Sequence, residues 1–273
     1  MIIVDAHVHI YDCFDLDKFL DAAYSNFKSE ADRLGVGDKF TPVLLLAEAE
    51  GNCWFDRLRE YADGRNTYKD TATQKWAFHH TGENESLTAS SGNSKELLII
   101  AGRQVETAEG LEVLALFTTA SFRPDNPIVD LIKEIRKHDA IPVIPWGFGK
   151  WLGRRGSVLN NLMKIQKDLK FYLGDNSGRP SFLCLPHQFK IAKNNGIHIL
   201  PGSDPLPFAN EFRQVGKFGL IIHETLSIDK PGKVLKQILL NPIYNFLPYG
   251  HLERPFRFFH NQFNMLFRSF VSE

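Results

Sequence analysis

The chain has 273 residues, 43% of them hydrophobic and 12% aromatic, so it can bury a large core as one domain or as two smaller ones. We favour one domain over residues 1–273. The 32 basic and 32 acidic residues cancel, so net charge predicts neither a nucleic acid partner nor a membrane surface. Cys13, Cys53 and Cys184 are far apart, which argues against disulfides and a cysteine zinc site. No stretch of the sequence is typical of a leader or a membrane span, and we expect a cytoplasmic protein.

The first stretch, Ile2 to Ile10, is mostly apolar or β-branched, which predicts a buried strand. Side chains two apart on a strand point the same way, so His7 and His9 share a face, with Cα atoms about 6.5 Å apart. Two imidazoles at this spacing can bind one metal ion. Two histidines hydrogen-bonded in a core or at a strand end explain an isolated His-x-His equally well, so other residues must decide.

Apolar runs then alternate with segments of helical periodicity, which is the pattern of a parallel sheet with helical crossovers. Seven or eight strands predict an α/β fold, a distorted (β/α)7–8 TIM-like barrel. Residues 62–95 are expected to form an inserted hairpin or loop, and residues 242–273 an aromatic-rich helical extension that closes the fold or contacts another subunit. The strands are expected near residues 2, 43, 97, 113, 141, 171, 197 and 219.

Ionisable side chains follow many of these strands. In β/α barrels, functional residues collect at the C-terminal ends of the strands, so we expect these side chains to gather at one end. The glycine-rich loop 147–156 also carries Lys150 and Arg154, and its cations and backbone N–H groups can receive an anion. A flexible turn with solvated charges explains this loop equally well. The residues at the strand ends are His7, His9, Glu48, Glu106, Lys150, Asp175 and Asp204.

Three short motifs together resemble the polymerase and histidinol phosphatase (PHP) family of metal-dependent hydrolases. They are Asp5-Ala6-His7-Val8-His9, Gly102-Arg103-Gln104-Val105-Glu106 and Gly202-Ser203-Asp204. The wider metal-dependent amidohydrolases look similar in the first and last motifs. The resemblance implies a distorted seven-stranded barrel whose strand ends hold divalent metal ions for phosphoester hydrolysis.

Carried over by this resemblance, His7 and His9 are metal ligands of the first strand, Glu106 is the bridging glutamate and Asp204 is the aspartate of the late motif. PHP proteins have histidines where this chain has Glu112 and Leu206, and their mid-chain His-Pro motif corresponds here to Pro145-Trp146. We therefore expect one or two ions rather than three. Mixed histidine and carboxylate ligands suit zinc, manganese and iron alike.

The chemistry expected of such a site is hydrolysis by a water molecule that the metal makes acidic near neutral pH. Asp204 or Asp175 would orient that water or accept its proton, and Lys150, Arg154 and Arg179 would hold an anionic substrate. The sequence thus predicts hydrolysis of a phosphoester in a small anionic metabolite, without nucleic acid or membrane partners. The alternatives are an amidohydrolase acting on C–N bonds and a non-catalytic barrel that binds a protein partner. A homo-oligomer formed through the aromatic tail is compatible with each.

Overall fold

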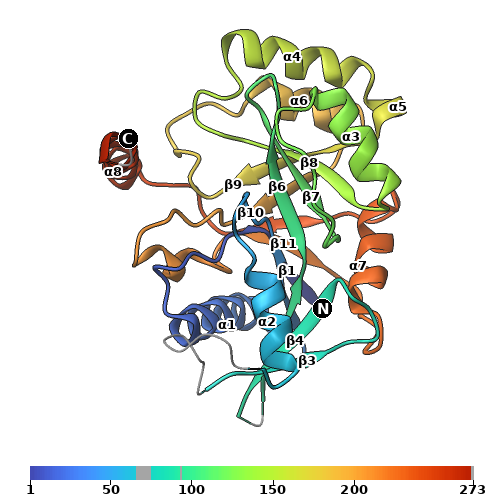
Figure 1. The fold of residues 1–273 in the computed structure, drawn as a ribbon, viewed down its shortest axis with the longest axis vertical. Helices are drawn as coiled ribbons and strands as arrows, with labels where there is room; N and C mark the ends of the chain where they lie inside the picture. Colours follow the sequence, from blue (N-terminus) through green and yellow to red (C-terminus); the bar gives the residue numbers. More distant parts are fainter. Residues whose placement is uncertain (66–74, 93, 272–273) are drawn as a thin grey trace.

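The computed structural model describes residues 1–65, 75–92 and 94–271 and has two β-sheets with helices on their outer faces (Figure 1). In the seven-stranded sheet the order is β12-β11-β1-β2-β5-β4-β3. Strands β1, β2 and β5 pair in parallel, whereas β11 and β4 flank them in antiparallel orientation. The strands are β1 (Ile2–Val8), β2 (Thr41–Leu46), β3 (Ala77–His80), β4 (Ser86–Ser91), β5 (Lys95–Ile100), β11 (Gly219–Ile222) and β12 (Leu247–Tyr249).

The five-stranded sheet has the order β10-β9-β8-β7-β6. Strands β8, β9 and β10 are parallel, and β6 and β7 form an antiparallel hairpin at the edge. The strands are β6 (Gly102–Glu106), β7 (Glu112–Leu116), β8 (Ile141–Pro145), β9 (Tyr172–Asn176) and β10 (Ile199–Gly202).

Helices α1 to α6 form the two outer layers, and their apolar residues recur at helical spacing. In α3, for example, Ile128, Leu131, Ile132 and Ile135 are all buried against the five-stranded sheet. Helices α1 and α2 cover the seven-stranded sheet. The helices are α1 (Leu16–Arg33), α2 (Trp54–Ala62), α3 (Ile128–Lys137), α4 (Gly153–Lys164), α5 (Gln166–Leu169), α6 (His187–Asn194), α7 (Pro231–Leu240) and α8 (Pro255–Val271), with a 3-10 helix at Glu211–Gln214.

A third apolar layer fills the space between the two sheets. Alternate side chains of β1 point to opposite faces, so Ile2 and Val4 enter this inner core whereas Ile3 packs against the outer helices. Leu235 and Leu239 of α7 also pack into the inner core. Burial on both faces explains why the parallel strands have almost uninterrupted apolar sequences.

The strands do not close into the TIM-like barrel predicted from the sequence. Such a barrel needs a helical crossover after each strand, but the segment 102–106, which is not among the expected strands, is a strand that pairs with β7. The two sheets remain separate, and backbone hydrogen bonds link them, for example beside β2 and beside β1. Gln104 N donates to Glu48 O at 2.8 Å, and Asp204 N donates to His7 O at 2.8 Å.

The described residues of the predicted insertion, 62–95, and of the predicted tail, 242–273, lie at the periphery of the two sheets (Figure 1). Strands β3 and β4 extend the seven-stranded sheet beyond β5, and residues 66–74 and 93 of the predicted insertion lie outside the described part. Helix α8 lies at the edge of the molecule, apart from both sheets (Figure 1). No helix in the described part is long and apolar enough to cross a membrane.

Candidate metal centre

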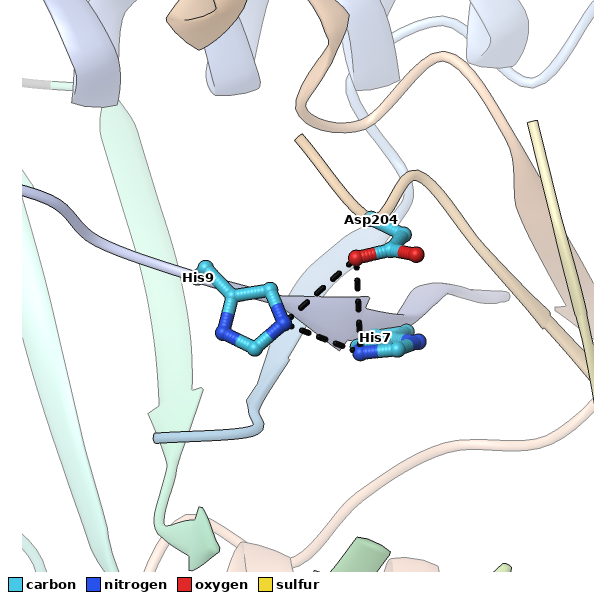
Figure 2. Close-up of side chains that lie close together, drawn as sticks. All are labelled: His7, His9 and Asp204. Atoms are coloured by element: carbon cyan, nitrogen blue, oxygen red, sulfur yellow. Dashed lines mark hydrogen bonds and ion pairs between the residues drawn. The ribbon is translucent and has the colours of Figure 1, made fainter. Parts of the chain in front are cut away.

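Three side chains converge where β1 passes the segment that follows β10. They are His7, His9 and Asp204 (Figure 2). The two Nε2 atoms of the histidines are 3.0 Å apart, and Asp204 Oδ1 lies 3.6 Å from Nε2 of His7 and 3.4 Å from Nε2 of His9. Both histidines are buried, whereas the Asp204 side chain is partly exposed. The two imidazoles therefore point to the same place, as their spacing predicts.

The backbone brings these side chains together by local irregularities. The pairing of β1 with β2 shifts register between Asp5 and Val8, and such a bulge redirects the side chains beside it. Gly202 lies against His7, because a Cβ atom at residue 202 would be 2.2 Å from His7 N. Asp204 has φ +47°, a left-handed conformation that aspartate tolerates better than most residues. Only glycine at 202 permits the close approach of the two ligand-bearing segments.

Asp5 anchors the segment that carries Asp204. It is fully buried, and its carboxylate accepts hydrogen bonds from Ser203 N at 2.7 Å and Gly216 N at 2.8 Å. Burial raises the pKa of Asp5 to about 7, although the N–H donors around it oppose this rise. Because Ser203 directly precedes Asp204, Asp5 fixes the chain next to a candidate ligand.

Two amide side chains complete the surroundings, and sequence reasoning gave neither a role. Gln104 Oε1 lies 3.1 Å from His7 Nε2. Asn176 Nδ2 donates to Asp204 Oδ2 at 2.9 Å and to Trp146 O at 2.8 Å, and its buried Oδ1 has no hydrogen-bond partner among the described residues. The alternation of side chains along β9 is the signal that could have separated Asn176 from its neighbour Asp175.

The electrostatics of the cluster favour the protonation states that a metal ion requires. Burial lowers the pKa of His7, since the buried imidazolium loses solvation, and the charge of Asp204 only partly offsets this. Burial alone would raise the pKa of Asp204, but the adjacent His7 and His9 outweigh it and bring that pKa to about 2. Near neutral pH the site therefore offers a neutral His7 and an ionised Asp204, as metal ligands must be.

The geometry also fits a divalent ion. Ligand atoms each about 2.1 Å from one ion are separated from one another by roughly 3.0–3.5 Å in octahedral or tetrahedral sites. The measured separations of 3.0, 3.4 and 3.6 Å lie close to this range. Two nitrogens and one carboxylate oxygen form a donor set that suits zinc, manganese or iron. The three residues can therefore hold one ion with small adjustments.

Glu106, predicted to be the bridging glutamate, lies outside this cluster. It is exposed at the end of β6 and is not among the side chains that converge in the described part. The residue of this motif that contacts His7 is Gln104, two positions earlier on the same strand. The Cα atoms of Gln104 and Glu106 are about 6.5 Å apart along the strand, and this distance keeps the Glu106 carboxylate away from His7.

Asp175 and Arg179, predicted to be catalytic and substrate-binding, bind each other. The Arg179 guanidinium donates to both carboxylate oxygens of Asp175, at 2.8 and 2.7 Å. Neighbouring side chains on β9 point to opposite faces, so Asn176 reaches Asp204 and Asp175 does not. The structure thus separates this pair from the cluster of His7, His9 and Asp204.

The two other predicted anion-binding residues are placed differently. Lys150 forms an ion pair with Glu112, and its charge is one of the factors that lower the pKa of Asp204. Arg154 is exposed on α4. Of the predicted cations, Lys150 is therefore the one whose charge reaches the cluster.

A cavity of about 720 Å³ opens beside Gln104, and its lining is acidic. Arg103 is a cation in this wall and pairs with Glu48 at 2.5 Å and Asp56 at 3.7 Å. Burial raises the pKa of Glu48, and Arg103 and the Phe55 N–H oppose this rise. The negative lining attracts cations. The carboxylates in the wall are Glu48, Glu50, Asp56, Glu106, Glu112 and Asp125.

The fold of this chain is similar to the folds of known protein structures. The structure resembles PsfC from Pseudomonas syringae PB-5123, with a TM-score of 0.54 and 14% identity over 90% of each chain. It also resembles the lesion-specific endonuclease PfuEndoQ from Pyrococcus furiosus, with a TM-score of 0.51 and 11% identity, covering 91% of this chain and 58% of that one. A two-domain protein from Bacteroides vulgatus ATCC 8482, described as containing a predicted PHP-like metal-dependent phosphoesterase, matches with a TM-score of 0.45 and 14% identity over 92% of this chain and 64% of that one.

No family model and no curated protein sequence matches the chain. The resemblance to PHP proteins that the motifs predict is confirmed at the level of the fold. Identities of 11 to 14% carry no activity from those proteins to this one.

The same comparison corrects the expectation about partners. The expectation of no nucleic acid partner rests on the balance of 32 basic and 32 acidic residues. The fold is shared with an endonuclease, so the exclusion of nucleic acid was wrong. Net charge summed over a chain does not describe its local surfaces, and only those decide which ligands bind.

Proposed function

We propose that the chain is a metal-dependent hydrolase that cleaves phosphoesters, with His7, His9 and Asp204 as metal ligands. The observation that carries this proposal is the convergence of the three ligand atoms within 4.8 Å of one another. The low pKa of Asp204 and the depressed pKa of His7 support it, because both groups are then ready to bind a cation. The fold likeness to an endonuclease agrees with phosphoester chemistry.

In this proposal a divalent ion, when bound, supplies Lewis acidity and makes a water molecule acidic near neutral pH. The residues of the chain position the reactants. Asn176 holds Oδ2 of Asp204, so that Oδ1 faces the two histidines. A carboxyl group with a pKa of about 2 is a weak proton acceptor, so Asp204 is better suited to hold the ion than to take a proton from water.

Lys150 is the cation proposed to contact the phosphoryl group. It is paired with Glu112, and about a third of its side chain is exposed. A phosphoryl oxygen near the cluster can replace Glu112 as its partner, since ammonium groups bind phosphate as point charges. Glu112 would then be available to accept a proton. These two roles follow from the pairing and from the charge that Lys150 exerts on Asp204.

The substrate panel follows from the corrected expectation about partners. It should include DNA duplexes, intact and carrying an abasic lesion, together with phosphomonoesters of small metabolites. Because the adjoining cavity is acidic, rates on polyanions should rise when a second divalent cation is supplied in excess. An amide panel tests the C–N hydrolase alternative in the same assay.

The test is hydrolysis of p-nitrophenyl phosphate, bis(p-nitrophenyl) phosphate and the duplexes by chelator-treated protein reconstituted with zinc, manganese or iron. We expect metal-dependent cleavage that falls at least about a hundredfold in His7→Ala/His9→Ala, because the loss of ligands should exceed the 10- to 100-fold effect of outer-sphere partners. His79→Ala is the matched control, since His79 is an exposed histidine on β3 bonded to Ser90. Equal activity in the double variant would contradict the proposal, and turnover of amides alone would replace it with the C–N hydrolase.

A further inference from the structure

Helix α8 presents apolar side chains on two faces. Phe258 and Asn261 are buried against the body of the protein. Phe256, Phe259 and Phe263 have exposed fractions of 86, 61 and 59%, and Leu266 is equally exposed. The exposed set recurs at three- and four-residue spacing, so these side chains form one stripe along the helix. Contiguous apolar surface of this kind marks an interaction site.

The stripe continues onto the body of the protein. The rings of Phe148 and Phe258 are 5.0 Å apart, and those of Phe182 and Phe259 are 5.8 Å apart. Phe148 and Phe182 are themselves about half exposed, and Leu152 on the same loop as Phe148 is 70% exposed. Two loops and α8 thus form a single apolar face, which we call the α8 face.

The segments that supply this face carry basic and no acidic residues, although the whole chain is neutral. Residues 140–167, 176–203 and 254–272, which supply the three parts of the face, contain lysine and arginine but no aspartate or glutamate. Arg154 and Arg254 are exposed there. The nearby acids Glu211 and Glu253 are both paired with Arg257. Within the described part of the chain, Arg154 and Arg254 are therefore two exposed positive charges of the α8 face that are not paired with Glu211 or Glu253.

We infer that the α8 face binds the surface of an anionic lipid bilayer, with α8 lying in the plane of the interface. A helix with phenylalanine and leucine on one face and cations beside it is the type that inserts at the headgroup level, where anionic lipids attract the cations. A second copy fits less well, because α8 has no carboxylate and pairing two copies would bring cations together. Nucleic acid fits less well, since bulky apolar side chains outnumber the exposed cations. This inference does not depend on the proposed catalytic function.

The test is co-sedimentation of the full chain with vesicles of phosphatidylcholine alone and of phosphatidylcholine mixed with phosphatidylglycerol. We expect binding to the anionic vesicles that weakens with salt. Phe259→Ser/Phe263→Ser should lower the partition coefficient about a hundredfold or more, because two large apolar side chains no longer leave water. Arg154→Gln/Arg254→Gln should lower it only for anionic vesicles.

Ile228→Ser is the matched control, because Ile228 is 96% exposed between β11 and α7, outside this face. Far-ultraviolet circular dichroism shows whether each variant keeps its fold. Absence of sedimentation with both kinds of vesicle would overturn the inference. It would also be overturned if Phe259→Ser/Phe263→Ser left sedimentation unchanged, or if that variant abolished dimerisation or oligonucleotide binding while the wild type ignored vesicles.

Discussion

Replacing Asp5 by alanine should be among the most destabilising single changes in this chain. The carboxylate accepts hydrogen bonds from Ser203 N and Gly216 N at 2.7 and 2.8 Å in a fully buried site. Asp5→Ala leaves both N–H groups without an acceptor, at a cost of about 1–3 kcal/mol each, so we expect a loss of roughly 2–6 kcal/mol. Domains of this kind have only about 5–15 kcal/mol of stability in total.

Urea unfolding with a chelator present measures this loss without the stabilisation that a bound ion would add. Asp5→Asn keeps one acceptor oxygen, and we expect it to lose about half as much. Asp15→Ala is the comparison on the surface: Asp15 caps α1 through Lys18 N, and its loss should cost about 1 kcal/mol. A change in the free energy of unfolding below about 1 kcal/mol for Asp5→Ala would refute the role given to this residue.

Three further changes probe the site and the fold. Gln104→Glu places a carboxylate beside His7 and should tighten zinc binding about tenfold or more, measured by chelator competition; weaker binding would count against the ligand assignment. Asn176→Leu removes the hydrogen bond to Asp204 Oδ2 and should weaken zinc binding about 10- to 100-fold in the same assay. Unchanged zinc affinity would show that Asn176 does not position Asp204. Burial raises the pKa of the Tyr249 phenol well above 10 in the folded state. The contribution of the neutral phenol to the free energy of unfolding is therefore fully present below pH 10, and it is lost as the pH rises toward the folded-state pKa. Above pH 10, wild type should therefore lose up to about 1.4 kcal/mol per pH unit relative to Tyr249→Phe, and parallel pH profiles would contradict this.

Much of the secondary structure follows from the sequence, because single strands and helices obey local periodicity. The apolar run of β1 and the spacing of Ile128, Leu131, Ile132 and Ile135 in α3 place both elements nearly as observed. The closed barrel predicted from the sequence is not observed. Local periodicity does not determine which strands pair, because strand pairing depends on contacts between residues far apart in the chain. The short segment between β6 and β7 is a sequence signal that could have predicted their hairpin. This hairpin interrupts the alternation of strands and helices.

The site was predictable where one strand sets the geometry. His7 and His9 converge because they are two residues apart, and the Gly-Ser-Asp motif pointed to Asp204. Gln104 and Asn176 were missed, because which of two neighbouring polar residues faces the site depends on the phase of a strand. That phase also explains why Asp175 lies outside the cluster of His7, His9 and Asp204, whereas Glu106 is on the same side of β6 as Gln104 but two residues farther along the strand.

The most direct test of the central claim is elemental analysis of the purified protein beside His7→Ala/His9→Ala. The account predicts about one or more equivalents of zinc, manganese or iron in the wild type and loss of that metal in the double variant, with circular dichroism unchanged. Absence of metal from both proteins after incubation with zinc and manganese would contradict a metal site at His7, His9 and Asp204.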